Sequence, residues 1–420
     1  MDNARPDEIE KGSQIGLSER ELGDPRVPTF PFHFDGITPS EEYAERRARC
    51  PLGTVRLASG HDAKLVVKYH DAALALADQR LTHDLRAPGS PRFTLGPSHY
   101  DAPSLLNMEG EGHRRIRRII APAFTPRRIQ RWDATIDRIA NDLLDAIESS
   151  GPPTDIVSEF CLRLPTRVMC HVLGIPEGDS HRFVEWSNAF VSSVALTSDE
   201  RMNLIMEFSG YISELLARKR SDPGDSLIDD LIASCDEGDY LTDPELIGLI
   251  ISLIAAGTDT TASALGRILL TLLSDDGLAW EELCAHQDLI PDAVEETLRL
   301  LVMGPSAALR LATDDVELPS GRINAGEAVV IATNSAMRDE TVFDKPNTVK
   351  FDRGARPPLL VFGKGAHVCL GTNLAKAEIR AALRLLVHRF PTLRLDTDTS
   401  ALRFTNGEII HSLKELPVTW

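Results

Sequence analysis

Residues 362–371 read FGKGAHVCLG and place one cysteine, Cys369, at the expected start of a helix. Gly363 and Gly365 let the backbone turn tightly and approach a flat ligand. The free N–H groups and partial positive charge of a helix N-terminus favour the thiolate, the form of cysteine that binds metal. No second cysteine completes a zinc or iron–sulfur ligand set, whereas an axial thiolate on haem iron needs only one sulfur. The alternative is a structural cysteine in a glycine turn.

Two side chains of this segment could assist such a ligand. Phe362 could shield the sulfur from water, and His367 could reach a haem propionate.

The sequence AGTDTT at residues 256–261 interrupts an apolar helical pattern that runs from Asp243 to about Leu273. Glycine costs about 1 kcal/mol in a helix interior, and Thr and Asp prefer caps. Either the helix breaks here into two, or a local bulge faces a ligand and frees a carbonyl and a hydroxyl to hold water.

The Cys segment matches the haem-loop pattern Phe-x-x-Gly-x-x-x-Cys-x-Gly at Phe362, Gly365, Cys369 and Gly371, and the chain resembles the cytochrome P-450 family from about Phe30 to Trp420. The resemblance implies a mainly α fold with small β-sheets. It implies a single triangular-prism-like catalytic domain over residues 28–420, with a long core-crossing helix over haem, after a flexible segment at 1–27. It also implies that Cys369 is the axial ligand of haem b.

The resemblance assigns roles to the AGTDTT segment. Ala256 and Gly257 would lie over the distal face of the haem, Thr260 would organise bound dioxygen and its water, and Asp259 would feed protons. A departure from many bacterial members is NSAMRDE at 334–340, where Met337 replaces an asparagine; we expect a minor consequence.

Charged residues elsewhere receive supporting roles. Glu296 and Arg299 would form a buried pair beneath the haem that ties to the segment before the Cys loop, although a pair spaced in this way is also common on surfaces. His113 and Arg117, one helical turn apart in HRRIRRIIAPAFTPRR, and Arg310 in LRLATDDVEL would bind the haem propionates, since arginine pairs well with carboxylates. The alternative for each is a solvated surface charge.

An electron donor must be a separate protein, because the chain has no flavin or nucleotide fingerprint and no cysteine cluster. The resemblance implies a ferredoxin or flavodoxin with an NAD(P)H reductase. A basic docking patch on the Cys side, unless these are scattered surface charges, would comprise Arg114, Arg115, Arg118, Lys364 and Lys376.

The substrate pocket has only candidate wall residues. Small side chains among them suggest room for a bulky molecule. The candidates are Phe93, Leu95, Phe190, Val194, Ser252, Ala255, Ser306, Ala308 and Ile410. The proline-rich stretch 81–108 and the region 190–198 are expected to form a mobile lid.

The whole chain restricts these options. A formal net charge of −18 over 420 residues argues against nucleic acid and anionic membranes as partners. Six scattered cysteines and the lack of an apolar leader indicate a cytoplasmic protein, expected to be a monomer, and the apolar stretch 246–258 is too short to span a bilayer. The expected activity is a monooxygenase that uses O2 to hydroxylate or epoxidise a small molecule of bacterial secondary metabolism. Oxidative coupling, desaturation, a peroxygenase and a non-enzymatic haem sensor are the alternatives, and the substrate stays open.

Overall fold

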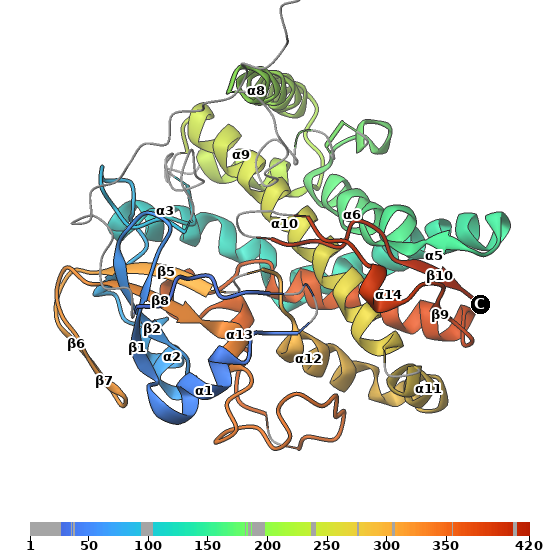
Figure 1. The fold of residues 1–420 in the computed structure, drawn as a ribbon. Helices are drawn as coiled ribbons and strands as arrows, with labels where there is room; N and C mark the ends of the chain where they lie inside the picture. Colours follow the sequence, from blue (N-terminus) through green and yellow to red (C-terminus); the bar gives the residue numbers. More distant parts are fainter. Residues whose placement is uncertain are drawn as a thin grey trace, which may run out of the picture.

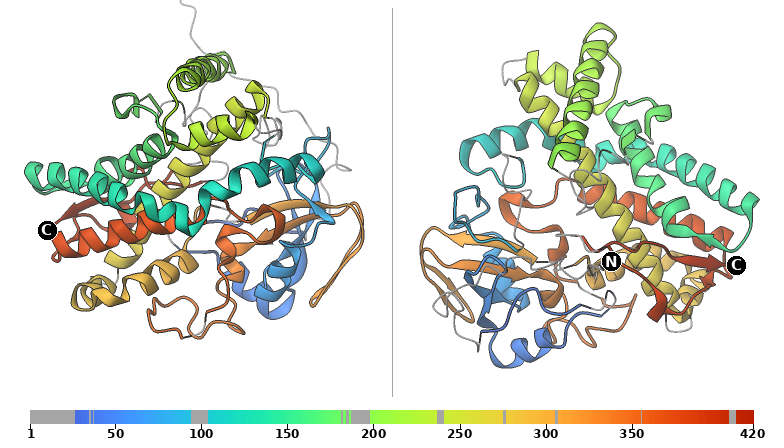
Figure 2. Two further views of the ribbon diagram at one scale, coloured as in Figure 1. Left: turned by 180° about the vertical axis from the view of Figure 1, so that it is seen from behind. Right: turned by 45° about the horizontal axis from the view of Figure 1, so that its top comes forward.

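The computed structural model has a helix-rich side and a strand-rich side (Figures 1 and 2). It describes residues 27–34, 36, 38–93, 104–180, 182, 183, 186, 198–236, 241–274, 277–304, 307–354, 356–405 and 410–420. The mainly α architecture with small sheets that the sequence predicts is confirmed.

A five-stranded sheet organises the strand-rich side. Its strand order is β1 (Leu52–Arg56), β2 (Asp62–Val66), β8 (Ala328–Ala332), β5 (Ala307–Ala312) and β3 (Leu81–Thr82). Ser59-Gly60-His61-Asp62 between two short apolar runs predicts a hairpin, and β1 and β2 form this antiparallel hairpin. β2 pairs in parallel with β8. The sheet thereby joins the first part of the chain to the strand that carries Arg310.

Smaller elements complete this side and the chain end. They are α1 (Glu42–Arg49), α2 (Tyr69–Ala75), α13 (Thr333–Ala336), the hairpin of β6 (Val316–Leu318) with β7 (Gly321–Ile323), and a sheet of β4 (Thr154–Asp155), β10 (Pro417–Thr419) and β9 (Arg394–Leu395).

The helix-rich side is built around α10 (Asp243–Leu273), a helix of 31 residues. By length and composition α10 could cross a membrane, but it lies in the protein core and packs closely against α6 and α8. The other main helices are α3 (Gly110–Ile120), α5 (Asp133–Ser150), α6 (Arg163–Leu173), α8 (Ser198–Ser221), α9 (Leu227–Asp236), α11 (Leu278–Ala285), α12 (Ile290–Leu300) and α14 (Thr372–Arg389). Figure 1 shows α10 passing through the middle of this group.

α10 is α-helical throughout, so neither the break nor the bulge expected at AGTDTT occurs. The hydroxyls of Thr258 and Thr260 donate to the carbonyls of Ile254 and Ala256, which lets polar side chains sit within the helix. In the sequence, Asp243-Pro244 is typical of a cap followed by a first-turn proline. The helix starts one residue earlier than that pattern predicts, because Thr242 is the cap and forms a capping box with Glu245.

In the sequence, Thr125-Pro126 is typical of a cap followed by a first-turn proline and predicts one helix toward Ile147, but the structure divides this helix. A short α4 (Pro126–Ile129) and a 3-10 turn, η2 (Gln130–Trp132), precede α5. The Thr125 hydroxyl donates to the carbonyl of Pro122 and caps nothing. Of the two segments expected to form a lid, residues 94–103 and 187–197 lie outside the described residues.

Candidate active site

The segment around Cys369 is a tightly closed loop that leads into α14. The Cys369 N–H donates to the carbonyl of Phe362 at 2.7 Å. Gly365 has φ +78°, and a Cβ there would stand 2.8 Å from the Cα of Ala77. Glycine is therefore required at 365 both by backbone conformation and by close approach of another backbone. Cys369 is exposed as a residue, although neighbouring protein surrounds much of its sulfur.

Opposing effects act on the Cys369 sulfur. The protein packed around it raises its pKa, while hydrogen bonds from the Gly371 backbone and Thr372 and the charge of Arg117 lower it. The helix start thus acts in the direction that the sequence predicts, but the pKa stays raised. A metal cation at the sulfur would deprotonate such a thiol.

Three stacked imidazoles lie beside the loop. His367 stacks between His83 and His113, with ring centroids 3.7 Å and 4.1 Å apart. His367 Nε2 lies 3.2 Å from Glu109 Oε2, and the backbone N–H of His83 donates to the same carboxylate. Burial above all, and then neighbouring cationic groups, lower the pKa of His83 to about 2 and that of His113 to about 4.

Two arginines belong to the same surroundings. Arg117 Nη2 donates to the carbonyl of Val368 at 2.8 Å, which ties α3 to the residue before Cys369. Arg310 is buried on β5, and its charge is among those that lower the pKa of His83. The structure therefore brings His113, Arg117 and His367 to the Cys369 loop, and Arg310 lies near enough for its charge to act on His83.

Sequence reasoning missed His83 and Glu109. His83 directly follows β3, Glu109 directly precedes α3, and neither residue belongs to a motif. Their contacts with His367 are therefore visible only in the folded chain. A weak signal was available, since Glu109 stands directly before the helix that carries His113.

The residues present fit haem. The Nε2 atom of His113 is buried and has no hydrogen-bond partner within the described part of the chain. A buried imidazole nitrogen of this kind calls for a polar partner. Two arginines and two histidines beside one accessible thiol suit a flat cofactor with carboxylates and one open axial position on its metal.

The residues of the AGTDTT segment of α10 differ in their exposure to solvent. Ala256 is exposed, and the side chains of Asp259 and Thr260 are half-buried. Burial raises the pKa of Asp259 to about 6, against a hydrogen bond from Thr258. A Cβ at Gly257 would meet the Met169 sulfur of α6 at 2.9 Å. The glycine lets α10 and α6 approach each other.

Glu296 and Arg299 form a fully buried ion pair on α12, with both nitrogen–oxygen distances at 2.9 Å. Glu296 also accepts from Arg353 Nε at 2.7 Å and from the Lys350 N–H. Arg299 donates to the carbonyl of Met337 at 2.7 Å. The pair thus fastens α12 to the segment that leads toward the Cys loop, and Met337, where the sequence departs from the family, takes part through its backbone.

The residues of the expected basic patch differ in their exposure and in their ion pairs. Arg114 is well exposed and pairs with Glu111 of its own helix, and Arg118 and Lys364 are also exposed. Arg115 instead pairs with Glu245 at the start of α10, and Lys376 pairs with Glu295 at 2.6 Å. These two ion pairs therefore join α3 to α10 and α14 to α12.

The structure places the expected pocket residues in different surroundings. Phe93 is buried in a core cluster, with its ring 5.7 Å from that of Phe30. Ala255 and Ile410 are also buried, and Ala308 of β5 is half-buried against a second core cluster. Ser252 is half-buried and donates to the carbonyl of Gly248. The remaining candidates, Leu95, Phe190, Val194 and Ser306, lie outside the described residues.

Comparison with known proteins gives the family context. A sequence profile of the family Cytochrome P-450 matches residues 39–278 and 281–416. The chain is 39% identical over 382 residues to nocardicin C N-oxygenase of Nocardia uniformis subsp. tsuyamanensis, which covers 90% of this chain and 94% of that protein. It is 34% identical over 395 residues to mycinamicin IV hydroxylase/epoxidase of Micromonospora griseorubida, covering 93% and 98%.

Among solved structures, the fold is similar to that of the LnmA cytochrome P-450 hydroxylase from the leinamycin biosynthetic pathway of Streptomyces atroolivaceus. The TM-score is 0.87 at 34% identity, and the match covers 94% of this chain and 100% of that one. Nearly the whole length of both chains is therefore comparable.

Proposed function

The chain belongs to the cytochrome P-450 family and is an oxygen-incorporating oxidoreductase, and on that premise we propose that it is a haem-thiolate monooxygenase of bacterial secondary metabolism. Its substrate would be a bulky small molecule, which it hydroxylates or epoxidises. The mycinamicin relative is named for both reactions, and the LnmA relative for hydroxylation. The observation that carries the proposal is the accessible Cys369 thiol beside His113, Arg117, His367 and Arg310.

In this proposal Cys369 ligates the iron of haem b, and the two histidines and two arginines bind its carboxylates. Haem held by a thiolate supplies dioxygen activation, because the sulfur donates electron density that favours O–O cleavage. Arg117 would act twice, since it already holds the carbonyl next to Cys369 and its charge favours the thiolate.

On α10, Asp259 and Thr260 would handle protons. A carboxyl group with a pKa of about 6 can both release and regain a proton near neutral pH. The Thr260 hydroxyl donates to the carbonyl of Ala256, so its oxygen keeps lone pairs to accept a proton or a water hydrogen. Electrons would come from a ferredoxin or flavodoxin with an NAD(P)H reductase, in the cytoplasm, to a monomeric enzyme.

The axial ligand is tested by spectroscopy. The reduced protein with carbon monoxide should show the strongly red-shifted Soret band of thiolate ligation, and Cys369→Ser should lose it. Cys50→Ser is the control, because Cys50 is also exposed and free. A band that survives Cys369→Ser, or that disappears in Cys50→Ser, would contradict the assignment.

The proton role is tested by the yield of product. Thr260→Ala should still bind substrate and accept electrons, but more of the reduced nicotinamide should be spent on releasing hydrogen peroxide. Thr271→Ala is the matched control, since Thr271 makes the same hydrogen bond to a carbonyl one turn back on α10. Unchanged product per nicotinamide in Thr260→Ala would show that another hydroxyl does this work.

A further inference from the structure

Arg267 of α10 joins two segments from opposite ends of the chain. The side chain is 5% exposed. Its Nη1 donates to the carbonyl of Gly36 at 2.6 Å, and its Nε and Nη2 donate to the carbonyl of His411. The guanidinium also lies over the rings of Phe34 and Phe404, at 5.4 Å and 4.8 Å from their centroids. One buried cation therefore contacts both the N-terminal segment and the C-terminal segment that carries Phe404 and His411.

These two segments also touch each other at this point. Gly36 has φ +95°, and a Cβ there would lie 2.2 Å from ring atoms of Phe404. The rings of Phe34 and His411 are 6.0 Å apart. We call this group of Phe34, Gly36, Arg267, Phe404 and His411 the Arg267 junction. Glycine at 36 is required by the backbone conformation and by the close approach of Phe404.

The Arg267 junction holds what we call the C-terminal hairpin, the described residues 403–405 and 410–414. Within it the N–H of Thr405 donates to the carbonyl of Ser412, and that of Lys414 to the carbonyl of Arg403. The hairpin approaches α10 closely at Gly266, where a Cβ would meet Leu413 at 3.6 Å. The hairpin also carries Ile410, an expected pocket residue that directly precedes His411.

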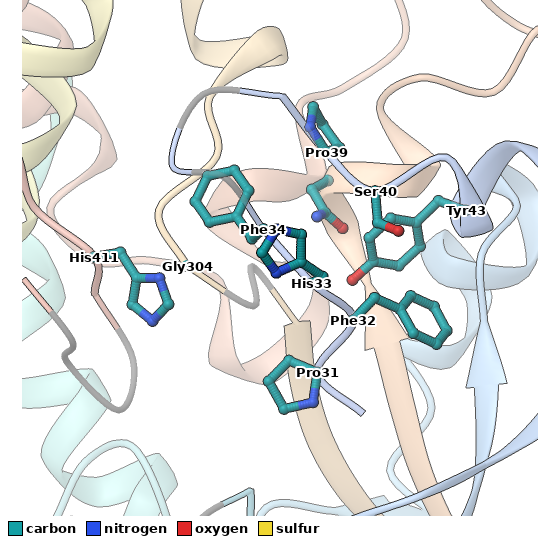
Figure 3. Close-up of a pocket in the computed structure, with 10 residues that line it drawn as sticks. Pro31, Phe32, His33, Phe34, Pro39, Ser40, Tyr43, Gly304 and His411 are labelled. Atoms are coloured by element: carbon teal, nitrogen blue, oxygen red, sulfur yellow. The ribbon is translucent and has the colours of Figure 1, made fainter. Parts of the chain in front are cut away.

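Two cavities lie beside these contacts of the hairpin. One of about 90 Å³ lies between His411, Gly304 and the N-terminal segment, lined also by Phe34 and Tyr43 (Figure 3). Another of about 20 Å³ lies between Ser412, Leu413 and α10, next to Ser263, whose buried hydroxyl has no partner within the described residues. Empty space beside a segment removes packing contacts that would otherwise fix its position. The hydrogen bonds of Arg267 are therefore a major part of what fixes the position of the hairpin.

Arg267 lies two helical turns beyond Thr260 on the same face of α10, about 10 Å along the axis. We propose that Arg267 is a positioning residue for substrate selection, which sets where Ile410 stands relative to Asp259 and Thr260 by fixing the C-terminal hairpin to α10. This inference rests on the proposed function, because it assumes that Ile410 borders the substrate. Arg267 contacts no substrate itself; it acts through the carbonyl of His411.

The first test measures hydrogen exchange in the haem-loaded protein. Hydrogen bonds from a buried charged group are strong enough that Arg267→Met should speed exchange in the hairpin by about tenfold or more, with α14 unchanged. Arg267→Lys should give a smaller increase, because an ammonium group cannot span both carbonyls. Arg163→Met, at an exposed helical arginine, is the control. Equal exchange in the hairpin of Arg267→Met and parent would overturn the proposal.

The second test uses two iron-binding probes, imidazole and an imidazole that carries a triphenylmethyl group. Only the bulky probe reaches the pocket wall, so Arg267→Met should change its dissociation constant by about tenfold relative to that of imidazole. A residue that merely stabilises the fold would shift both constants together, and that outcome, or two unchanged constants, would overturn the proposal. If imidazole gives no spectral change in the parent protein, the proposed function fails, and the exchange measurement still decides whether Arg267 fixes the hairpin.

Gly36→Ala is a second variant in case Arg267→Met folds poorly. It keeps the arginine but displaces Phe404 from the Arg267 junction, so it should alter the ratio of the two dissociation constants in the same way. A normal ratio in folded Gly36→Ala would contradict the proposed junction.

Discussion

The loop around Cys369 and the C-terminal hairpin are both short segments that adjoin helices, yet they are held in different ways. A backbone hydrogen bond closes the loop, Gly365 presses against the backbone of Ala77, and the Glu296 network fixes the segment leading to it. The hairpin is bordered by two cavities and is tied to α10 by Arg267. Under the proposed function, the contrast suits a cofactor side that must stay in place and a substrate side that is packed less tightly.

The largest expected effect is on the Cys side, at Glu296. Glu296→Ala would leave Arg299 and Arg353 buried without their carboxylate, and removing one partner of a buried pair costs about 3–5 kcal/mol. The free energy of unfolding, measured in urea, should fall by that amount, and haem retention should fall with it. Glu159→Ala is the control, since its exposed pair with Arg163 contributes less than about 1 kcal/mol. If Glu296→Ala and Glu159→Ala lower the free energy of unfolding equally, the buried Glu296 network stabilises the protein no more than a surface ion pair does.

Asp259 predicts a pH dependence on the α10 side. Its pKa of about 6 lies above the ordinary value of 3.8, so between these values the folded protein binds more protons than the unfolded chain. The stability that Asp259 contributes is complete below the ordinary value and is lost as pH rises through about 6. Asp259→Asn should therefore be more stable than the parent at about pH 8, by at most about 3 kcal/mol, and equal to it near pH 4. Urea unfolding between about pH 4 and about pH 8 measures the free energy of unfolding of both proteins. A difference between them that does not change with pH would contradict the raised pKa of Asp259.

Two glycines that the sequence assigns to the cofactor site should respond differently. Gly365→Ala forces a side chain into a left-handed conformation against the Ala77 backbone, which should cost about 1–3 kcal/mol and speed haem loss. Gly257→Ala meets only the flexible thioether of Met169 and gains helix propensity, so its stability should change by less than about 1 kcal/mol. Unfolding and haem transfer to apomyoglobin measure both. Equal effects would mean that the loop is no more constrained than the helix.

The difference between the two sides also explains what could be predicted from the sequence. The Cys369 loop and the Glu296–Arg299 pair match short family motifs, and the resemblance rather than the spacing alone predicted the buried pair. The cap at Thr242 and the division of the 125–147 helix were mispredicted by a residue or a turn, because alternative caps adjoin one another. The packing of Phe93 against Phe30 and the place of His83 beside His367 were not predicted, because both depend on contacts between distant segments that no local spacing indicates.

The smallest effect is expected on the surface near the Cys loop, where Arg114 and Arg115 are neighbours in sequence but not in role. Arg114 is exposed, so its charge can attract an acidic ferredoxin without fixing any part of the fold. Arg114→Gln should raise the KM for ferredoxin a few-fold at low salt, with kcat unchanged, and the effect should fade as salt screens the charges. Arg115 pairs with Glu245 across α3 and α10, so Arg115→Gln should lower stability slightly and leave the salt dependence of KM as it is. Reduction of the haem protein by ferredoxin at two ionic strengths separates the two variants. If Arg115→Gln changes the salt dependence as much as Arg114→Gln does, the ion pair with Glu245 does not withdraw Arg115 from the docking surface, and the larger patch expected from the sequence is correct.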